Sequence, residues 1–155
     1  MKLKTKIAQQ MKDIFLERDW SVATSYKTEL TDLPWKKATT KLGSMNSIAV
    51  LAFHIDYYIA GILNVFENGK LEISDKYSFN MSPIKSQEDW EKLYNKTWID
   101  AEKLAILVKQ MPENKLEEVF VDEKYGNYYR NLTALVNHSY YHLGQIVLIK
   151  KMLKQ

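Results

Sequence analysis

Residues 138–142 read His-Ser-Tyr-Tyr-His and supply two of the three histidines in a chain of 155 residues. They lie in the last long stretch with helical periodicity, where side chains four positions apart stand one above the other. On a wheel of 3.6 residues per turn, several apolar positions fall within about 40° of His142. With His138, they are Leu135, Ile146, Ile149 and Leu153. The spacing therefore places both imidazoles in the middle of a face that we expect to be buried.

The third histidine, His54, lies in a second stretch that is apolar on almost every side. Such a helix is expected at the centre of the fold. The face of His54 carries Ser47, Val50, Tyr58, Gly61 and Val65. Gly61 lacks a side chain, so a neighbouring helix or a ligand could approach this face closely.

The three imidazoles are the candidate metal ligands. A buried imidazole has to satisfy both ring nitrogens or lose free energy, and two imidazoles four positions apart on a helix can bind one ion at about 2.0–2.1 Å each. We predict that all three converge on one divalent cation. The alternative is a set of core histidines hydrogen-bonded to Tyr58, Tyr141, Gln145 or backbone carbonyls. Tyr58 and Gln145 share the histidine faces, and we expect them either to orient the site from outside or to serve packing alone.

The composition predicts one globular domain covering residues 1–155. Hydrophobic residues make up 46% of the chain, which suffices for a sizeable core. They form no run of the ~18 apolar residues that a membrane helix needs. The basic start, residues 1–6, leads into an amphipathic pattern rather than the apolar segment of a secretion signal. We therefore expect a cytoplasmic protein with no membrane partner.

Cysteine is absent, which excludes a disulfide framework, a zinc–thiolate site and a cysteine nucleophile. Any thiol chemistry would need an external thiol. Nucleic-acid readers rely on arginine, whereas the 22 basic residues here are lysine except for Arg18 and Arg130. The lysines are interleaved with the 19 acidic residues. We therefore expect a mixed, solvated surface and no nucleic-acid partner.

The first helical pattern begins near Leu3. We expect it to continue, with a kink at residues 19–21, to about Leu33, where Pro34 ends it. Residues 34–46 read as a loop because they are rich in turn formers.

A second helix is expected from Ser47 to about Phe66, with Asn46 as its N-cap and residues 68–69, Asn-Gly, at its end. The following residues 70–85 lack periodicity. A loop of this length is either a functional lid or pocket wall, or an ordinary surface crossover.

Residues 86–89, Ser-Gln-Glu-Asp, resemble a capping box and start a third helix, in which Trp90 and Trp98 are expected to be core anchors. A fourth helix is expected over residues 128–153, with Asn127 as its cap. Four long helices with connections of unequal length predict an all-α four-helix bundle, with a long crossover loop between helices two and three.

The fourth helix carries more apolar surface than one bundle seam requires. Val136, Leu143 and Val147 flank the histidine stripe. This surplus either pairs with a second copy in a homodimer or is covered by closer packing inside the monomer.

Two segments resemble the DinB/YfiT-like superfamily of metal-binding four-helix bundles. They are residues 47–55, Ser-Ile-Ala-Val-Leu-Ala-Phe-His-Ile, and residues 137–146, Asn-His-Ser-Tyr-Tyr-His-Leu-Gly-Gln-Ile. The His-x-x-x-His-x-Gly-Gln-Ile ending is the most specific part. The helix start at Trp90 lies where the third helix of the family begins. The resemblance spans most of the chain, although the first helix is too variable to contribute.

The resemblance implies a metal triad of His54, His138 and His142, with water or a further ligand completing the shell. The ion would be zinc or nickel, with iron or manganese as further options. Relatives are described as metal-dependent hydrolases or as enzymes that use a low-molecular-weight thiol, and many form homodimers. Other members have no established activity.

Three imidazoles with open positions are typical of a catalytic rather than a structural metal site. We therefore predict a metal-dependent hydrolase or a thiol S-transferase acting on a small molecule. The alternatives are a non-catalytic metal- or ligand-binding bundle, and a helical module that binds nucleic acid or a protein partner. No acid is identified by its spacing as a general base, since Asp56 falls on the opposite face of its helix from His54.

Overall fold

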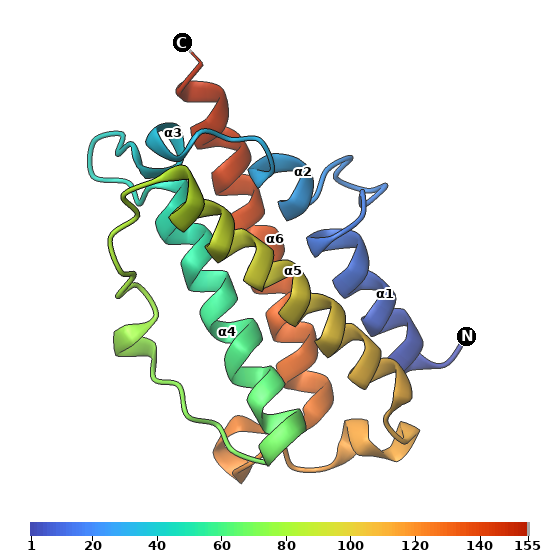
Figure 1. Ribbon diagram of the computed structural model, residues 1–155. Helices are drawn as coiled ribbons and strands as arrows, with labels where there is room; N and C mark the ends of the chain where they lie inside the picture. The colour runs from blue at the N-terminus through green and yellow to red at the C-terminus, as the bar shows by residue number, and fades with distance from the viewer. Residues whose placement is uncertain (155) are drawn as a thin grey trace.

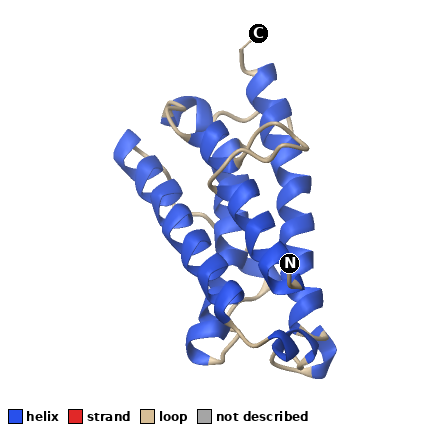
Figure 2. Ribbon diagram, turned by 90° about the vertical axis from the view of Figure 1, so that its right-hand side faces the viewer, coloured by secondary structure: helices blue, strands red, loops and turns tan. Residues whose placement is uncertain are grey.

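Four main helices packed against one another make up most of the chain. The computed structural model describes residues 1–154, and within them it contains no strand (Figure 1). The main helices are α1 (Leu3–Phe15), α4 (Ile48–Asn68), α5 (Gln87–Gln110) and α6 (Tyr128–Met152). α5 packs against α1 and α4, and α6 packs against the same two helices, so the four enclose one hydrophobic core. They lie lengthwise beside one another (Figure 2). The all-helical prediction is confirmed.

α4 lies at the centre because its sequence is apolar all round. Ile55 and Ile59 are fully buried. By length and hydropathy alone this helix would pass as a membrane span, but 67% of the window concerned is buried inside the protein. The core helix of a globular protein passes the same test. Its N-cap is Ser47, whose hydroxyl accepts from the Val50 amide, and not Asn46 as predicted. Gly69 ends it in the left-handed conformation, as expected.

α1 is shorter than the sequence predicted, because the chain leaves the helix after Phe15. The carboxylate of Asp19 accepts hydrogen bonds from the amide of Ser21 (2.7 Å) and from the hydroxyl of Tyr140 on α6 (2.5 Å). These bonds hold a tight turn in which Ala23 has a positive φ of 58°. An aspartate that bonds nearby backbone competes with helix formation. The prediction of a kinked helix to Leu33 is therefore wrong; a separate short helix, α2 (Tyr26–Leu30), follows.

The segment predicted as a loop, residues 34–46, contains another short helix, α3 (Trp35–Thr39). Pro34 occupies its N-cap position, where the missing amide costs nothing. α3 packs against α4. The loop prediction is wrong for these five residues.

α4 and α5 run in the same direction, and α1 and α6 run the opposite way (Figure 1). The connection between α4 and α5 must therefore return along the whole of α4, about 31 Å at 1.5 Å per residue. It does so along the outside of α4 and includes a single 3-10 turn, η1 (Asp75–Tyr77). We call residues 70–85 the crossover loop. Its Ile73 lies against Gly61, so the close neighbour of this glycine is the loop rather than a helix or a ligand.

The last two main helices begin where the sequence predicts. Ser86 caps α5 by accepting from the Asp89 amide, and Asn127 caps α6 by accepting from the Arg130 amide. Trp90 is fully buried and its indole donates to the Leu33 carbonyl at 3.0 Å, which confirms its role as a core anchor. Two 3-10 turns, η2 (Glu113–Glu117) and η3 (Glu123–Tyr125), connect α5 to α6.

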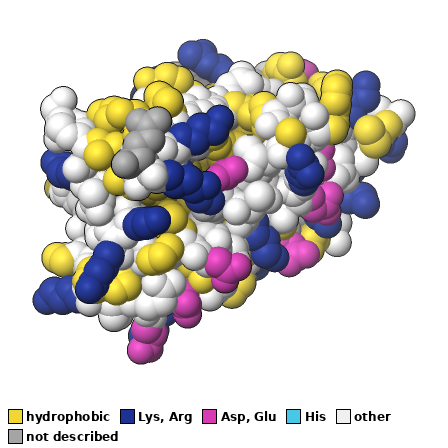
Figure 3. Space-filling model, turned by 90° about the horizontal axis from the view of Figure 1, so that it is seen from above, with side chains coloured by type: hydrophobic (Ala, Val, Ile, Leu, Met, Phe, Trp, Pro, Cys, Tyr) yellow, Lys and Arg dark blue, Asp and Glu magenta, His cyan; other side chains and the backbone are white. Residues whose placement is uncertain are grey.

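The apolar residues that flank the histidines on α6 are covered within the monomer. Val136 and Leu143 are buried, and Val147 packs against the core. These residues therefore leave no surplus for a second copy, and a homodimer stays a prediction without them. At one end of the molecule, basic and acidic side chains are interspersed (Figure 3).

Candidate metal centre

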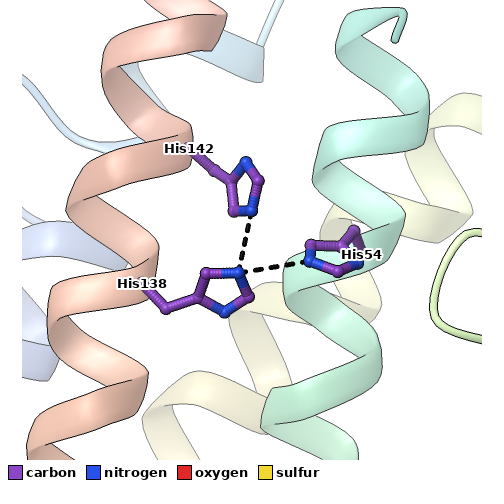
Figure 4. Close-up of side chains that lie close together, drawn as sticks. All are labelled: His54, His138 and His142. Carbon is purple, nitrogen blue, oxygen red and sulfur yellow. Dashed lines mark hydrogen bonds between the residues drawn. The ribbon is translucent and has the colours of Figure 1, made fainter. Parts of the chain in front are cut away.

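The three histidines, far apart in sequence, meet between α4 and α6 (Figure 4). The Nε2 atom of His138 lies 2.8 Å from Nε2 of His142 and 3.2 Å from Nε2 of His54. One ring nitrogen from each residue lies within 4.8 Å of the other two. His54 and His142 are buried and His138 is half-buried. The predicted convergence of these residues is what the structure shows.

The outer nitrogens of two rings are held by acceptors. Nδ1 of His54 lies 3.1 Å from the Ser78 carbonyl, and Nδ1 of His142 lies 2.7 Å from Oε1 of Gln145. A carbonyl oxygen only accepts, so Nδ1 of His54 carries the proton, and Nδ1 of His142 carries it with the Gln145 amide oriented in this way. In a neutral imidazole with its proton on Nδ1, the Nε2 atom is unprotonated and carries a lone pair. Two lone pairs therefore point toward the Nε2 atom of His138.

All three rings are biased toward the neutral form. Burial, together with the neighbouring His142 and His54, lowers the pKa of His138 to about 4. Burial also lowers the pKa of His54 and of His142. A neutral His138 has one ring N–H proton, which can donate a hydrogen bond to one of the two neighbouring lone pairs but not to both. The cluster is thus short of protons at its centre, and a cation in that position would satisfy every inward-facing nitrogen.

The donor set and spacing fit a metal ion. Nitrogen ligands at about 2.0–2.1 Å in tetrahedral geometry lie about 3.3 Å apart. The observed 3.2 Å is close to that value, and the 2.8 Å pair would open by roughly half an ångström. The cluster of His54, His138 and His142 can therefore hold a metal ion. Imidazole donors suit zinc, nickel, copper or iron, so the donor set does not select one of them.

The crossover loop forms one wall of the site. The Phe79 ring stacks on His54 with centroids 3.9 Å apart, and the neighbouring Ser78 supplies the carbonyl to the same ring. Tyr58 lies edge-on to both His54 and His138, and its hydroxyl donates to Asp75 of the loop at 2.8 Å. The loop is therefore a pocket wall, one of the two roles that its length allowed.

Of the other polar residues considered from the sequence, some lie at the histidine cluster and others point away from it. Gln145 contacts His142, and Tyr58 adjoins the cluster without bonding a histidine. Tyr141 is 64% exposed, although its ring lies edge-on to His142. Asp56 faces away, toward Lys96 and Thr97 of α5.

Sequence reasoning missed Asp75, Ser78 and Phe79. Their loop has no periodicity that could place them, and the contribution of Ser78 is a backbone carbonyl, which any residue type supplies. The length of the loop was the one available signal.

Comparison with protein-family models, with curated proteins and with solved structures finds no match.

Proposed function

We propose that the protein binds one divalent metal ion through Nε2 of His54, His138 and His142, and that it is a DinB/YfiT-like bundle that uses the ion on a small molecule. The resemblance of residues 47–55 and 137–146 supports this assignment. So does the long connection between α4 and α5, which is the crossover expected between helices two and three.

The observation that carries the proposal is the convergence of three neutral imidazoles. Ser78 and Gln145 fix the outer protons of two rings, so that the lone pairs of these rings are directed inward. Pure core histidines would not need such an arrangement, because any polar neighbour could satisfy a nitrogen. Outer hydrogen bonds that orient the ligating rings are a regular feature of metal sites.

The chemistry we propose is hydrolysis or transfer from a low-molecular-weight thiol. A divalent ion at this position would act as a Lewis acid and lower the pKa of a bound water or thiol. The chain itself supplies the orientation of the rings and the exclusion of water from one face of His54 by Phe79. Tyr58 and Asp75 supply a hydroxyl and a carboxylate beside the cluster, as candidates for proton transfer. The chain has no cysteine, so the thiol would come from outside.

The test is metal content after purification without an affinity tag, since tag histidines would bind metal themselves. Wild-type protein should hold close to one zinc or nickel ion per chain by elemental analysis, with iron and manganese measured alongside. His54→Ala and His142→Ala should each release it. Ser139→Ala is the matched control, because Ser139 is fully buried on α6 between two of the histidines and bonds the Leu135 carbonyl. Stoichiometric metal in a histidine variant would refute the triad.

A second candidate is a non-catalytic bundle in which the ion stabilises the fold. It is favoured by the placement of His54 on α4 and the other two ligands on α6, since one ion would cross-link two core helices. Chelation separates the two functions. A catalytic site loses turnover while the protein stays folded, whereas a structural ion is released together with a large fall in melting temperature.

A further inference from the structure

A groove adjoins the histidine cluster. One hollow of about 310 Å³ is lined by His138 together with Tyr58, Ile62, Asn131 and their neighbours on α6. A second hollow of about 440 Å³ shares Tyr58, Ile62 and Asn131 and extends under the crossover loop. Because three lining residues are common to both, we treat them as one groove, which begins at the candidate metal centre.

The lining of this groove is mainly apolar and aromatic. Beyond Ile62, its outer part is formed by Leu71, Ile73, Phe120 and Tyr125. These side chains come from the crossover loop and from the connection between α5 and α6. A groove of this kind favours a ligand with an extended apolar body.

Charge narrows the class of ligand further. Asp75 lines the groove, and its carboxylate accepts a hydrogen bond at 2.8 Å from the hydroxyl of Tyr58, which lines the same groove. Of the 22 basic residues in the chain, none lines the groove within residues 1–154. By contrast, the hollow between α1 and α5 is lined by Lys12 and Lys109. The side-chain amine of Lys124 lies over the Tyr125 ring. The same amine also lies 3.9 Å from the carboxylate of Asp122.

A negative charge on the part of a ligand that lies along the groove, away from the ion, would lose its hydration without gaining a cationic partner, and it would face the Asp75 carboxylate. We infer that the groove binds the body of the substrate, and that this substrate is an elongated small molecule whose body is mainly apolar and carries no negative charge, and whose polar head reaches the ion at His138. The inference rests on the proposed metal function and deepens it. It disfavours thiols that carry carboxylates as the molecule held in the groove.

The experiment compares three hydroxamates, which share one metal-binding head, by calorimetry on zinc-loaded protein. Acetohydroxamate has no tail, 6-phenylhexanohydroxamate has an apolar tail, and the monohydroxamate of suberic acid has a carboxylate tail. The apolar tail should tighten binding at least about tenfold over the head alone, or about 1.4 kcal/mol. The carboxylate tail should give no gain. Equal gains from both tails, or no gain from either, would overturn the inference.

Two lysine substitutions locate the effect. Tyr125→Lys places a cation in the groove, so the apolar tail should lose most of its gain and the carboxylate tail should acquire one. Tyr129→Lys is the matched control, because Tyr129 is exposed to almost the same extent (41% against 39%) and does not line the groove. A Tyr125→Lys variant that behaves like the control would refute the assignment.

Failure of the metal proposal gives a different pattern. If the protein takes up no zinc, acetohydroxamate will not bind and the head contributes nothing. The groove is then tested with 6-phenylhexanol, followed through the amide resonances of the metal-free protein. Shifts centred on Tyr58, Ile62 and Asn131 and abolished by Tyr125→Lys would support the groove, and shifts elsewhere would contradict it.

Discussion

Replacing Gly61 with alanine should have opposite effects on stability depending on whether Ile73 is present. A Cβ atom at Gly61 would lie 2.5 Å from Cδ1 of Ile73 and 2.9 Å from its Cγ1 and Cγ2. In a helix interior, alanine in place of glycine gains about 1 kcal/mol. Overpacking of this kind costs about 1–3 kcal/mol. Gly61→Ala alone should therefore be neutral or destabilising by up to about 2 kcal/mol.

Removing the clash should reverse the sign. In an Ile73→Ala background the three clashing atoms are gone, so Gly61→Ala should stabilise by up to about 1 kcal/mol, and the coupling between the two sites should be about 1–3 kcal/mol. Urea unfolding of the four proteins of the cycle measures it. Gly144→Ala is the matched control, since a Cβ there meets no atom within 4 Å, and it should stabilise in either background. An equal gain from Gly61→Ala with and without Ile73 would refute the packing of the crossover loop against α4.

Three further changes test other parts of the fold. Asn127→Ala should cost about 1 kcal/mol through loss of the α6 cap, measured as a fall in melting temperature of about 2–4 °C; an unchanged value would argue against the cap. Trp90→Ala should cost about 3–5 kcal/mol in urea unfolding, since it empties a buried site and removes the donor to Leu33, and a cost below about 1 kcal/mol would contradict its burial. Burial opposes ionisation of Glu29, but hydrogen bonds that include Lys150 outweigh it and hold its pKa below the ordinary 4.5. Glu29→Gln should therefore reduce stability at pH 7, and its effect should fade as the pH drops below 4.5; a pH-independent effect would exclude the ion pair.

The main helices and the convergence of the histidines could be predicted because both depend on local periodicity. The pair at positions 138 and 142 needs one helix turn, and His54 needs only to face inward from a helix that is apolar all round. Ser86 and Asn127 were identified as caps for the same reason, since a cap acts within three residues of itself.

Apart from the cap predicted at Asn46 and the short helix α3, the errors come from contacts that are distant in sequence. Asp19 ends the first helical region partly because it accepts from Tyr140, 121 positions away. The wall of the site depends on a backbone carbonyl at Ser78 and on the stacking of Phe79, and neither has a sequence pattern. The covering of Val136 and Leu143 likewise depends on tertiary packing, which helix periodicity does not describe.

X-ray absorption by the metal in untagged protein reports its ligands directly. Our account predicts multiple-scattering features of three imidazoles at about 2.0–2.1 Å. These features should disappear together with the ion in His138→Ala and should be unchanged in Ser139→Ala. A shell of oxygen donors without imidazole scattering, or a spectrum that His138→Ala leaves intact, would contradict the assignment of this cluster as a metal centre.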